Sequence, residues 1–453
     1  MIDLPDSPLS LWLDRYGPYT PEPPLHGDLT VDVAVVGGGL TGMAAACALR
    51  RAPASPSVAV LEAKTVGYGA SGRNGSFAMT VVGLGFGTTA LIRGKRFLAR
   101  AHAYMERCVD ELERFIDDEH LDCEKIRPGF LRVATTPSYV KRLQKQVDLM
   151  RSLGFDGISW IEGDETRAMV ASERYLGAMW EPRLLLVDPA KLVREEKRLA
   201  LQLGAQVFEG APVLAIASAS GAGGGGFRLL TPGGSVSADR LVFATNAYSH
   251  LFADLARTQV PAFTYMVATE PLSGEQLAPI GWEGGQGLED ARNLIHYYRL
   301  TPDRRLVMGG GPVGLKAGNS LDGDSDEKAW RHLEEHIHWL WPHLEGVRVT
   351  HRWGGPFSVT LNLTPALGYA GEARRAVYSL GCIGHGVAMS YVNGKVLAGL
   401  VTGDDAAGEG CPFVDRRVIP WPAEPLATVA KHALRDYLRA EDAFYERGVA
   451  RLR

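Results

Sequence analysis

The stretch Val31-Asp-Val-Ala-Val-Val-Gly-Gly-Gly-Leu-Thr-Gly-Met43 decides the fold of this chain. Its first six residues form a short apolar run, typical of a buried strand, and the alanine-rich residues 43–50 after the glycines favour a helix. A second apolar run at 58–61 ends at Glu62, and residues 51–57 form the connecting loop. The order strand, glycine turn, helix, strand predicts an α/β domain with a parallel sheet.

Three of these glycines have the Gly37-x-Gly39-x-x-Gly42 spacing of the Rossmann dinucleotide-binding fingerprint. Gly37 allows a tight turn, Gly39 lets the backbone approach a pyrophosphate, and Gly42 lets the helix pack closely on the strand. The N–H groups at the helix N-terminus attract the diphosphate, and Glu62 lies where a carboxylate binds the adenosine ribose. The cofactor-binding residues predicted from this unit are Gly37, Gly39, Leu40, Thr41, Gly42, Glu62 and Ala63.

Glycine is also the one residue type in clear excess. The chain has 53 glycines among 453 residues, where an average usage of about 7% predicts roughly 32. The glycines do not recur at every third position as in the G-X-Y repeat of collagen, and the chain has 26 prolines, so collagen is excluded. Lys+Arg 48 against Asp+Glu 52 gives a formal net charge of −4, so we expect no nucleic-acid and no membrane partner. The length allows two or three domains.

Cysteine and histidine give no convincing metal site. The five cysteines stand far apart and include no C-x-x-C pair. His332-Leu-Glu-Glu-His336 matches the H-x-x-E-H zinc pattern, but no third ligand follows, so we expect a solvated, charged face on a helix over 324–344. No signal peptide and no membrane-spanning run are evident, and we expect a reducing, cytoplasmic compartment.

A second glycine-rich loop, Gly67-Tyr-Gly-Ala-Ser-Gly-Arg-Asn-Gly75, follows Glu62. Four glycines beside small hydroxyl, amide and guanidinium groups suit backbone contact with a second phosphate or a flat ring. Together with Val-Val-Gly-Gly-Gly-Leu-Thr-Gly and Leu61-Glu62, this loop resembles the D-amino-acid oxidase/sarcosine oxidase superfamily of FAD enzymes. Within that superfamily the sequence is most similar to the branch that contains gamma-glutamylputrescine oxidoreductase.

Three later segments extend the resemblance over most of residues 10–405. They are Leu241-Val-Phe-Ala-Thr-Asn-Ala-Tyr248, Val213 within 210–216, and Gly381-Cys-Ile-Gly-His-Gly386 before a helix over 387–402. The resemblance implies FAD as the cofactor. It adds the cofactor-binding residues Gly69, Ala70, Ser71, Arg73, Asn74, Gly75, Val213, Thr245, Asn246, Gly384, His385, Gly386 and Val387.

The implied fold class is α/β, with a discontinuous Rossmann-type FAD-binding domain of the glutathione-reductase kind. An inserted α+β substrate domain is expected on an antiparallel or mixed sheet. We expect residues 1–90, 155–258 and 350–410 in the FAD-binding domain, 91–154 and 259–349 in the substrate domain, and 411–453 as a C-terminal helical tail.

The resemblance implies an FAD-dependent oxidase or dehydrogenase that acts on the C–N bond of a gamma-glutamylputrescine-like or other primary or secondary amine. Flavin N5 takes a hydride from a C–H beside an amine nitrogen, and the resulting imine hydrolyses to an aldehyde. The strand His296-Tyr-Tyr-Arg299 can send only two of its four side chains to one side. The substrate-binding residues expected are Tyr265, His296, Tyr298 and Arg299, and the catalytic residues expected are His385, Tyr298 and Trp353.

Departures from the sarcosine oxidase pattern narrow these expectations. Val387-Ala388 follow the Gly-His-Gly motif where sarcosine oxidases have a lysine, and residues 305–309 lack the lysine used for oxygen activation. The cysteine that tethers flavin is absent from 358–365, so we expect non-covalent FAD.

Two alternatives to amine oxidation remain open. One is an amino-acid or aminophosphonate oxidase in which Arg299 holds the anion, and the other is a flavoprotein or NAD-binding protein with a silent active site. The sequence leaves open the exact substrate, the acceptor (oxygen or another) and the oligomeric state.

Overall fold

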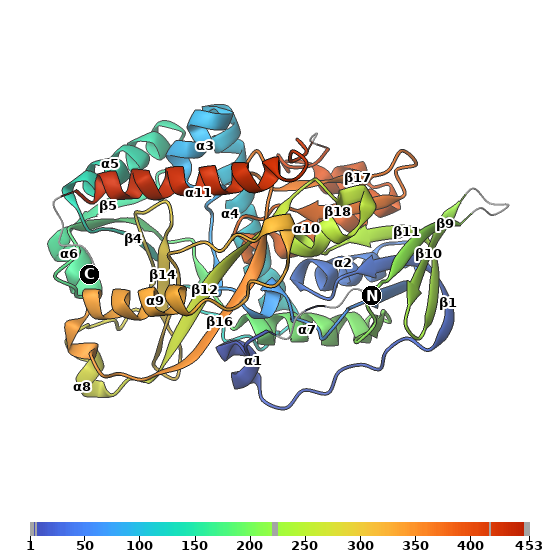
Figure 1. Ribbon diagram of the computed structural model, residues 1–453, viewed down its shortest axis with the longest axis horizontal. Helices are drawn as coiled ribbons and strands as arrows, with labels where there is room; N and C mark the ends of the chain where they lie inside the picture. Colours follow the sequence, from blue (N-terminus) through green and yellow to red (C-terminus); the bar gives the residue numbers. More distant parts are fainter. Residues whose placement is uncertain (1–3, 5–6, 220–224, 416–417, 448–453) are drawn as a thin grey trace.

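The computed structural model describes residue 4 and residues 7–219, 225–415 and 418–447. Its strands form two large sheets that lie beside each other (Figure 1). The first sheet contains the strand–helix–strand unit predicted from the glycine motif, and the second sheet is mixed. The α/β fold expected from the sequence is therefore confirmed.

The first sheet is centred on β1 (Gly27–Val36). It pairs in parallel with β2 (Val58–Leu61) and with β11 (Gly234–Phe243), and β11 pairs in parallel with β18 (Ala376–Leu380). The apolar run of β1 is buried because both faces of a parallel sheet are covered. The sheet is completed by β8 (Gln206–Phe208), β17 (Ala366–Ala370), β9 (Ala215–Ala219) and β10 (Gly226–Thr231).

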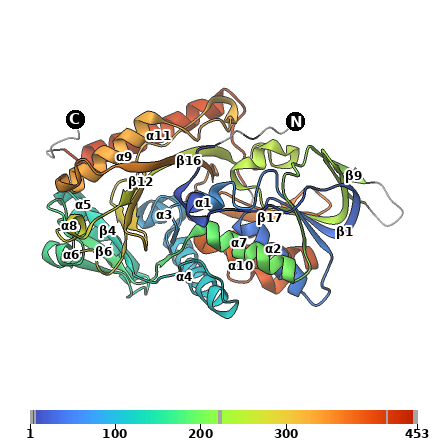
Figure 2. The same cartoon turned by 90° about the horizontal axis from the view of Figure 1, so that it is seen from below.

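Helices cover one face of the first sheet. They are α2 (Leu40–Arg51), α4 (Lys95–Asp118), α7 (Pro189–Gln202) and α10 (Gly386–Thr402), which share a buried core with the sheet. Figure 2 shows α2, α7 and α10 grouped together. Small residues allow α2 and α10 to touch, since a Cβ on Gly394 would lie 2.6 Å from Cβ of Ala44.

The second sheet runs β16-β12-β15-β14-β13-β4-β6-β5, with only β13 and β4 parallel among its neighbours. This order joins segments from distant parts of the chain. The strands are β4 (Phe130–Ala134), β5 (Ser159–Glu162), β6 (Gly177–Glu181), β12 (Val260–Pro271), β13 (Gly287–Asp290), β14 (His296–Leu300), β15 (Arg305–Gly310) and β16 (Val349–Val359).

Pleating gives the second sheet two different faces. Tyr265 and Tyr298 belong to a buried apolar core that the sheet forms with α9 (Glu327–Leu340). Thr264 and Tyr297, one residue away in each strand, line a cavity on the opposite face. That face is turned toward the glycine-rich loops of the first sheet, so the cavity lies between the two halves of the molecule.

The remaining elements lie around the two sheets. The C-terminal helix α11 (Leu426–Tyr445), in red in Figure 1, is held to the second sheet's half of the molecule through Asp442, which accepts the backbone N–H groups of Asn293 and Leu294. Within the described residues, no helix combines the length and the apolar character that crossing a membrane requires. These elements are α1 (Leu11–Tyr16), α3 (Phe86–Arg93), α5 (Pro137–Ser152), α6 (Gly163–Met169), α8 (Gly274–Leu277), α11 (Leu426–Tyr445), β3 (Phe77–Ala78) and β7 (Leu185–Leu186).

The sheets divide the chain at points that differ from the expected domain limits. Strands β5 and β6 were expected within the FAD-binding segment 155–258, and β16 within 350–410, but all three belong to the second sheet. Conversely, α4 lies in the expected substrate segment and packs on the helices of the first sheet. Periodicity identifies a strand but not its partner, and pairing partners set the domain limits.

Burial of Glu181 on β6 makes the stability of the fold depend on pH. Its carboxylate accepts a hydrogen bond from the Thr80 hydroxyl, and desolvation raises the pKa of Glu181 to about 7 from the ordinary 4.5. Because the pKa of Glu181 is higher in the folded than in the unfolded chain, the protonated carboxyl group contributes to the free energy of unfolding. That contribution is complete below pH 4.5 and is lost as pH rises through 7.

We predict that Glu181→Gln removes about 3 kcal/mol of the decline in unfolding free energy between pH 4.5 and 8. Urea titrations of wild type and variant across that range measure the difference. Glu165→Gln, on the exposed side of α6, removes the same charge as a control and is expected to keep the wild-type slope. Parallel pH curves for wild type and Glu181→Gln would contradict the assignment.

Candidate active site

The glycine motif forms one end of a groove at the carboxyl ends of the central strands of the first sheet. A cavity of about 110 Å³ lies there, lined by the motif, the 67–71 loop, Glu62 and Val213. Gly37 has a φ of +107°, and a Cβ there would lie 2.6 Å from the carbonyl oxygen of Ala244. Gly37 therefore meets both demands expected of it, a tight turn and a close neighbouring backbone.

Gly42 determines how closely α2 approaches the end of β1. A Cβ on Gly42 would lie 2.0 Å from the carbonyl oxygen of Gly37, so no other residue fits without displacing backbone. Gly39, at the N-cap of α2, has no side-chain capping bond. This helix terminus lines the groove and can bind an anion, as the spacing predicts.

Glu62 is held at the carboxyl end of β2 by backbone donors. Its Oε2 accepts the N–H of Gly38 at 2.7 Å, and its Oε1 accepts that of Lys64 at 3.0 Å. Desolvation raises the pKa of Glu62, and the two backbone donors oppose this rise. The carboxylate is thereby fixed in the small cavity, in a position suited to a ribose hydroxyl.

The second glycine loop is braced by its own side chains. Ser71 Oγ accepts the N–H of Leu40, the first residue of α2, and Asn74 Nδ2 donates to the carbonyl of Ala70 at 3.1 Å. Arg73 donates to the carbonyls of Tyr68 and Gly354, which ties the loop to β16. Arg73 thus holds the loop in place, while its neighbours Ala70 and Ser71 line both cavities.

The C-terminal motif adds the N-terminus of a second helix. Helix α10 begins at Gly386 behind the N-cap His385, which makes no side-chain capping bond. His385 Nε2 lies 3.1 Å from the carbonyl oxygen of Gly83 and donates to it. Burial lowers the pKa of His385 to about 4, so its ring is neutral near pH 7. An uncapped helix N-terminus here can stabilise negative charge on a bound ring.

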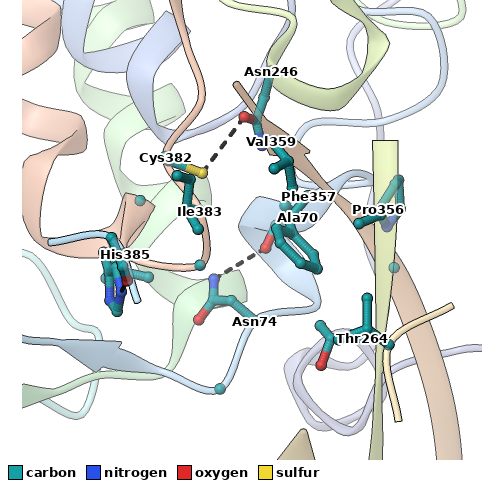
Figure 3. Close-up of a pocket in the computed structure, with 18 of the residues that line it drawn as sticks. Ala70, Asn74, Asn246, Thr264, Pro356, Phe357, Val359, Cys382, Ile383 and His385 are labelled. Atoms are coloured by element: carbon teal, nitrogen blue, oxygen red, sulfur yellow. Dashed lines mark hydrogen bonds between the residues drawn. The ribbon is translucent and has the colours of Figure 1, made fainter. Parts of the chain in front are cut away.

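A second cavity of about 340 Å³ continues from the first, and both include Gly39, Ala70, Ser71, Ala244 and Asn246. Figure 3 shows Cys382, Ile383 and His385 on one side of it and Thr264 and Pro356 on the other. All the residues expected to bind the cofactor line one of these two cavities, except Gly42, which lies inside α2.

The wall of the larger cavity opposite the glycine loops comes from the second sheet. Tyr297 lies against the 67–75 loop, since a Cβ on Gly75 would approach its ring to 2.5 Å, and its hydroxyl is 3.3 Å from Thr264 Oγ1. Phe357 of β16 and the buried ion pair Glu289–Arg132 also line the cavity. Sequence reasoning missed these four residues. Period-two alternation offered a signal for Tyr297, but none existed for the ion pair.

The C-terminal helix also contributes to this cavity. Lys431, Leu434, Arg435 and Leu438 of α11 line it. Lys431 Nζ donates to the carbonyl of Lys316 and to Asn319 Oδ1, both at 2.9 Å. The segment 411–453, expected to be a C-terminal helical tail, thus takes part in the candidate site.

Five residues expected at the substrate site lie outside the lining of the cavity. His296, Tyr298 and Tyr265 face α9, because pleating places them opposite Tyr297 and Thr264. Tyr298 bonds the hydroxyl of Tyr175 at 2.9 Å, and Tyr265 donates to the carbonyl of Gly323. The structure gives these three side chains packing contacts instead.

Trp353 and Arg299 anchor the loops that surround the cavity. Trp353 Nε1 donates to the carbonyl of Arg73 at 2.9 Å. Arg299 donates to Ser76 Oγ at 2.7 Å and to the carbonyl of Val187. Neither side chain reaches the cavity lining, so the structure gives both residues a positioning role.

Of the two histidines in the H-x-x-E-H pattern, His336 is buried and His332 is half-buried, which corrects the expectation of a solvated face. His336 is fully buried, and its ring stacks on that of His296 with centroids 3.9 Å apart and planes 10° apart. His296 donates from Nδ1 to Asp290 at 2.8 Å and lies 2.9 Å from His332 Nε2.

This cluster is poorly arranged for a metal. Ligand atoms of Asp290, His296 and His336 lie within 4.8 Å of one another. Imidazole lone pairs lie in the ring plane, so parallel stacked rings do not converge on one ion. Arg292 also occupies the Asp290 carboxylate. We therefore assign the cluster a packing role.

A family model described as FAD dependent oxidoreductase (DAO) matches residues 32–400 of this chain. The chain therefore belongs to the FAD-dependent oxidoreductase family, and its cofactor is FAD. The groove fits this cofactor, because the N-termini of α2 and α10, a buried carboxylate and two glycine loops line its length, and neither N-cap residue caps its helix with a side chain.

Named relatives place the chain within that family. It is 31% identical to gamma-glutamylputrescine oxidoreductase of Escherichia coli (strain K12), over 93% of this chain and 96% of the relative. It is 26% identical to glycine oxidase of Bacillus licheniformis, over 83% of this chain and 95% of the relative. Relatives with different named substrates thus align over most of the same length.

Solved structures agree on the fold. Glycine oxidase from Geobacillus kaustophilus aligns with a TM-score of 0.70 and 24% identity, covering 86% of this chain and 100% of that chain. L-proline dehydrogenase from P. horikoshii aligns with a TM-score of 0.68 and 19% identity, covering 86% and 98%. At this identity the likeness concerns the fold alone.

We predict that Gly42→Ala weakens FAD binding more than 10-fold and destabilises the protein by about 1–3 kcal/mol. The added methyl group would displace the Gly37 carbonyl by at least about 1 Å, since real Cβ contacts are essentially never below 3.0 Å. Flavin absorbance of the purified protein and thermal unfolding measure the two effects.

Gly87→Ala is the matched control for this substitution. Gly87 lies within α3, and a Cβ there would meet nothing within 4 Å. This variant is expected to retain wild-type FAD content and equal or higher stability. Equal FAD affinity in Gly42→Ala and Gly87→Ala would contradict the role given to Gly42.

Proposed function

We propose that the protein oxidises the C–N bond of a primary or secondary amine with FAD, giving an imine that hydrolyses to an aldehyde. The observation that carries this proposal is the continuity of the two cavities: the FAD-binding loops lead directly to a chamber walled by the second sheet. Similarity to gamma-glutamylputrescine oxidoreductase over 93% of the chain supports an amine as substrate.

The walls of the chamber favour a neutral amine at the reacting position. When bound, FAD supplies the acceptor for the hydride. Met79, Val81, Tyr297 and Phe357 all line the chamber, so water is largely replaced by apolar and aromatic surface. Desolvation disfavours the ammonium form, and only the neutral amine has the free lone pair that the reaction needs.

His385 acts in this proposal as a neutral donor rather than as an acid or a base. Its Nε2–H holds the carbonyl of Gly83, and its pKa of about 4 keeps the ring uncharged at physiological pH. Together with the N-terminus of α10, it fixes the Gly384–Gly386 backbone against the chamber. The work of the site is positioning and electrostatic stabilisation.

An amino-acid oxidase is the second candidate, favoured by the similarity to glycine oxidases. Such a substrate needs a cation for its carboxylate. Arg73 donates to backbone carbonyls, and Lys431 donates to one carbonyl and to Asn319 Oδ1. Arg132 pairs with Glu289, and Arg435 pairs with Asp436. Arg299, expected to hold an anion, lies outside the lining. Because the cationic side chains of the chamber are already bonded to other protein groups, we favour an amine over an amino acid as the substrate.

We expect the FAD to be bound without a covalent link. Cys382 lines the chamber, but burial raises the pKa of its thiol and the Sγ donates to Asn246 Oδ1 at 3.5 Å, so it is a poor nucleophile. Acid precipitation should release all the flavin and leave a chain of 49.0 kDa by mass spectrometry. Flavin fluorescence that stays with the denatured chain would contradict this.

The proposed reaction is tested by anaerobic mixing of the yellow protein with a panel of amines and amino acids. We predict that simple amines bleach the flavin absorbance at least about 100-fold more efficiently than glycine or sarcosine, because a buried, unpaired carboxylate costs about 3 kcal/mol. Re-admission of air then separates an oxidase from a dehydrogenase. Bleaching by amino acids alone would reject the amine proposal in favour of the second candidate.

Two adjacent tyrosines provide a matched pair for the same assay. Tyr297→Phe alters the chamber and is expected to lower the efficiency of flavin reduction about 10-fold, the usual effect of one lost polar contact. Tyr298→Phe removes a hydroxyl on the opposite face and should leave that efficiency unchanged. The reverse result would place the substrate on the other face of the sheet.

A further inference from the structure

One row of residues crosses the face of the second sheet that lines the chamber. Backbone pairing places Gly309 beside Tyr297, Tyr297 beside Glu289, and Glu289 beside Arg132. Side chains directly opposite each other on neighbouring strands share one face of a sheet. Tyr297, Glu289 and Arg132 therefore form a continuous strip of chamber wall, and all three line the cavity.

The charged pair in this strip is buried but only partly satisfied. Glu289 is 0% exposed and Arg132 is 6% exposed, and their ion pair joins Arg132 NH2 to Glu289 Oε1. Glu289 Oε2 has no hydrogen-bond partner within the part of the chain that the structure describes. Buried polar atoms nearly always have a partner, so a free carboxylate oxygen at a cavity wall indicates a ligand that donates N–H or O–H.

The chemistry of the pair favours a cationic ligand. An ammonium group has three donors and would complete a carboxylate that already holds one guanidinium. An anionic ligand would instead meet the negative charge of Glu289, and the neighbouring cation Arg132 already pairs with that carboxylate through NH2, although its Nε has no partner among the described residues. The other cations of the lining are also partnered.

The group held at Glu289 cannot be the nitrogen that reacts. A carboxylate stabilises the protonated form of a nearby amine, whereas oxidation requires that nitrogen to have a free lone pair. A second ammonium on the same molecule has no such requirement. A substrate with two nitrogens separated by a carbon chain can place a neutral amine in the apolar chamber and an ammonium group at the Glu289 carboxylate.

We infer that Glu289 binds a second, non-reacting ammonium group of the substrate, with Arg132 as the residue that positions its carboxylate. The substrate class is then a diamine, or an amine with another positive charge at a distance from the reacting nitrogen. This inference rests on the proposed amine oxidation, because it assigns the far end of that substrate.

The test measures binding separately from oxidation. Isothermal titration calorimetry of the FAD-loaded enzyme, reduced beforehand with dithionite, compares 1,4-diaminobutane with n-butylamine, which has the same carbon chain and one charge fewer. We expect the wild type to bind the diamine about 10- to 100-fold more tightly, the usual strength of one hydrogen bond to a charged group. Glu289→Gln should bind both amines equally.

Two further variants separate binding from folding. Glu289→Gln leaves Arg132 buried without a counterion, so the double variant Glu289→Gln/Arg132→Gln removes both charges and is also expected to show no diamine preference. Glu283→Gln, in the exposed loop before β13, removes one charge elsewhere and should keep the full preference. Flavin absorbance and thermal unfolding verify that each variant is loaded and folded.

Each outcome decides the inference. A wild type without diamine preference, or a preference retained in the loaded Glu289→Gln and double variants, would overturn it. Loss of the preference in these variants alone supports it. The anaerobic assay of flavin reduction remains a separate measurement: diamine binding that depends on Glu289 without any amine-driven bleaching would reject amine oxidation and keep the cation site.

Discussion

The contact between the Gly37 carbonyl and α2 at Gly42 is the constraint on which the cofactor half depends. It sets α2 against the end of β1, and a hypothetical Cβ only 2.0 Å from that oxygen shows how little freedom remains. Helix α10 then packs on α2 through Gly394 and Ala44. The two helix N-termini that line the groove are therefore positioned by one another, although they come from opposite ends of the chain.

Arginine side chains transmit this arrangement to the second sheet. Arg73 leaves the glycine loop to hold the carbonyl of Gly354 on β16, and Trp353 returns a bond to the carbonyl of Arg73. Arg299 similarly joins β14 to Ser76, beside the same loop. These buried guanidinium groups donate their hydrogen bonds to backbone carbonyl and hydroxyl oxygens. They fix the distance between the two walls of the chamber and do not supply charge to a ligand.

The sequence predicts those parts of the site whose residues lie close together along the chain. Gly37, Gly42 and Glu62 lie within one strand–helix–strand unit, so spacing alone identified Gly37 and Glu62 as groove residues and Gly42 as the residue that sets α2 beside them. The chamber wall is different. The run His296-Tyr-Tyr-Arg299 predicts that side chains alternate between the two faces of the sheet, but not the phase of that alternation, and so not which side chains face the cavity. The sequence therefore favoured Tyr298, whereas Tyr297 is the one that lines the cavity. The phase is set by α9, which covers one face of the sheet.

The Glu289–Arg132 pair lies beyond any local pattern, because 157 residues separate its members. They meet only through the parallel pairing of β13 with β4, the one parallel contact between neighbours in the second sheet. A change at either position alters the chamber wall without touching the glycine loops or their helices. A fold of this kind can keep its cofactor site constant while strip residues of the second sheet vary. Relatives named for different substrates align with 93% and 83% of this chain.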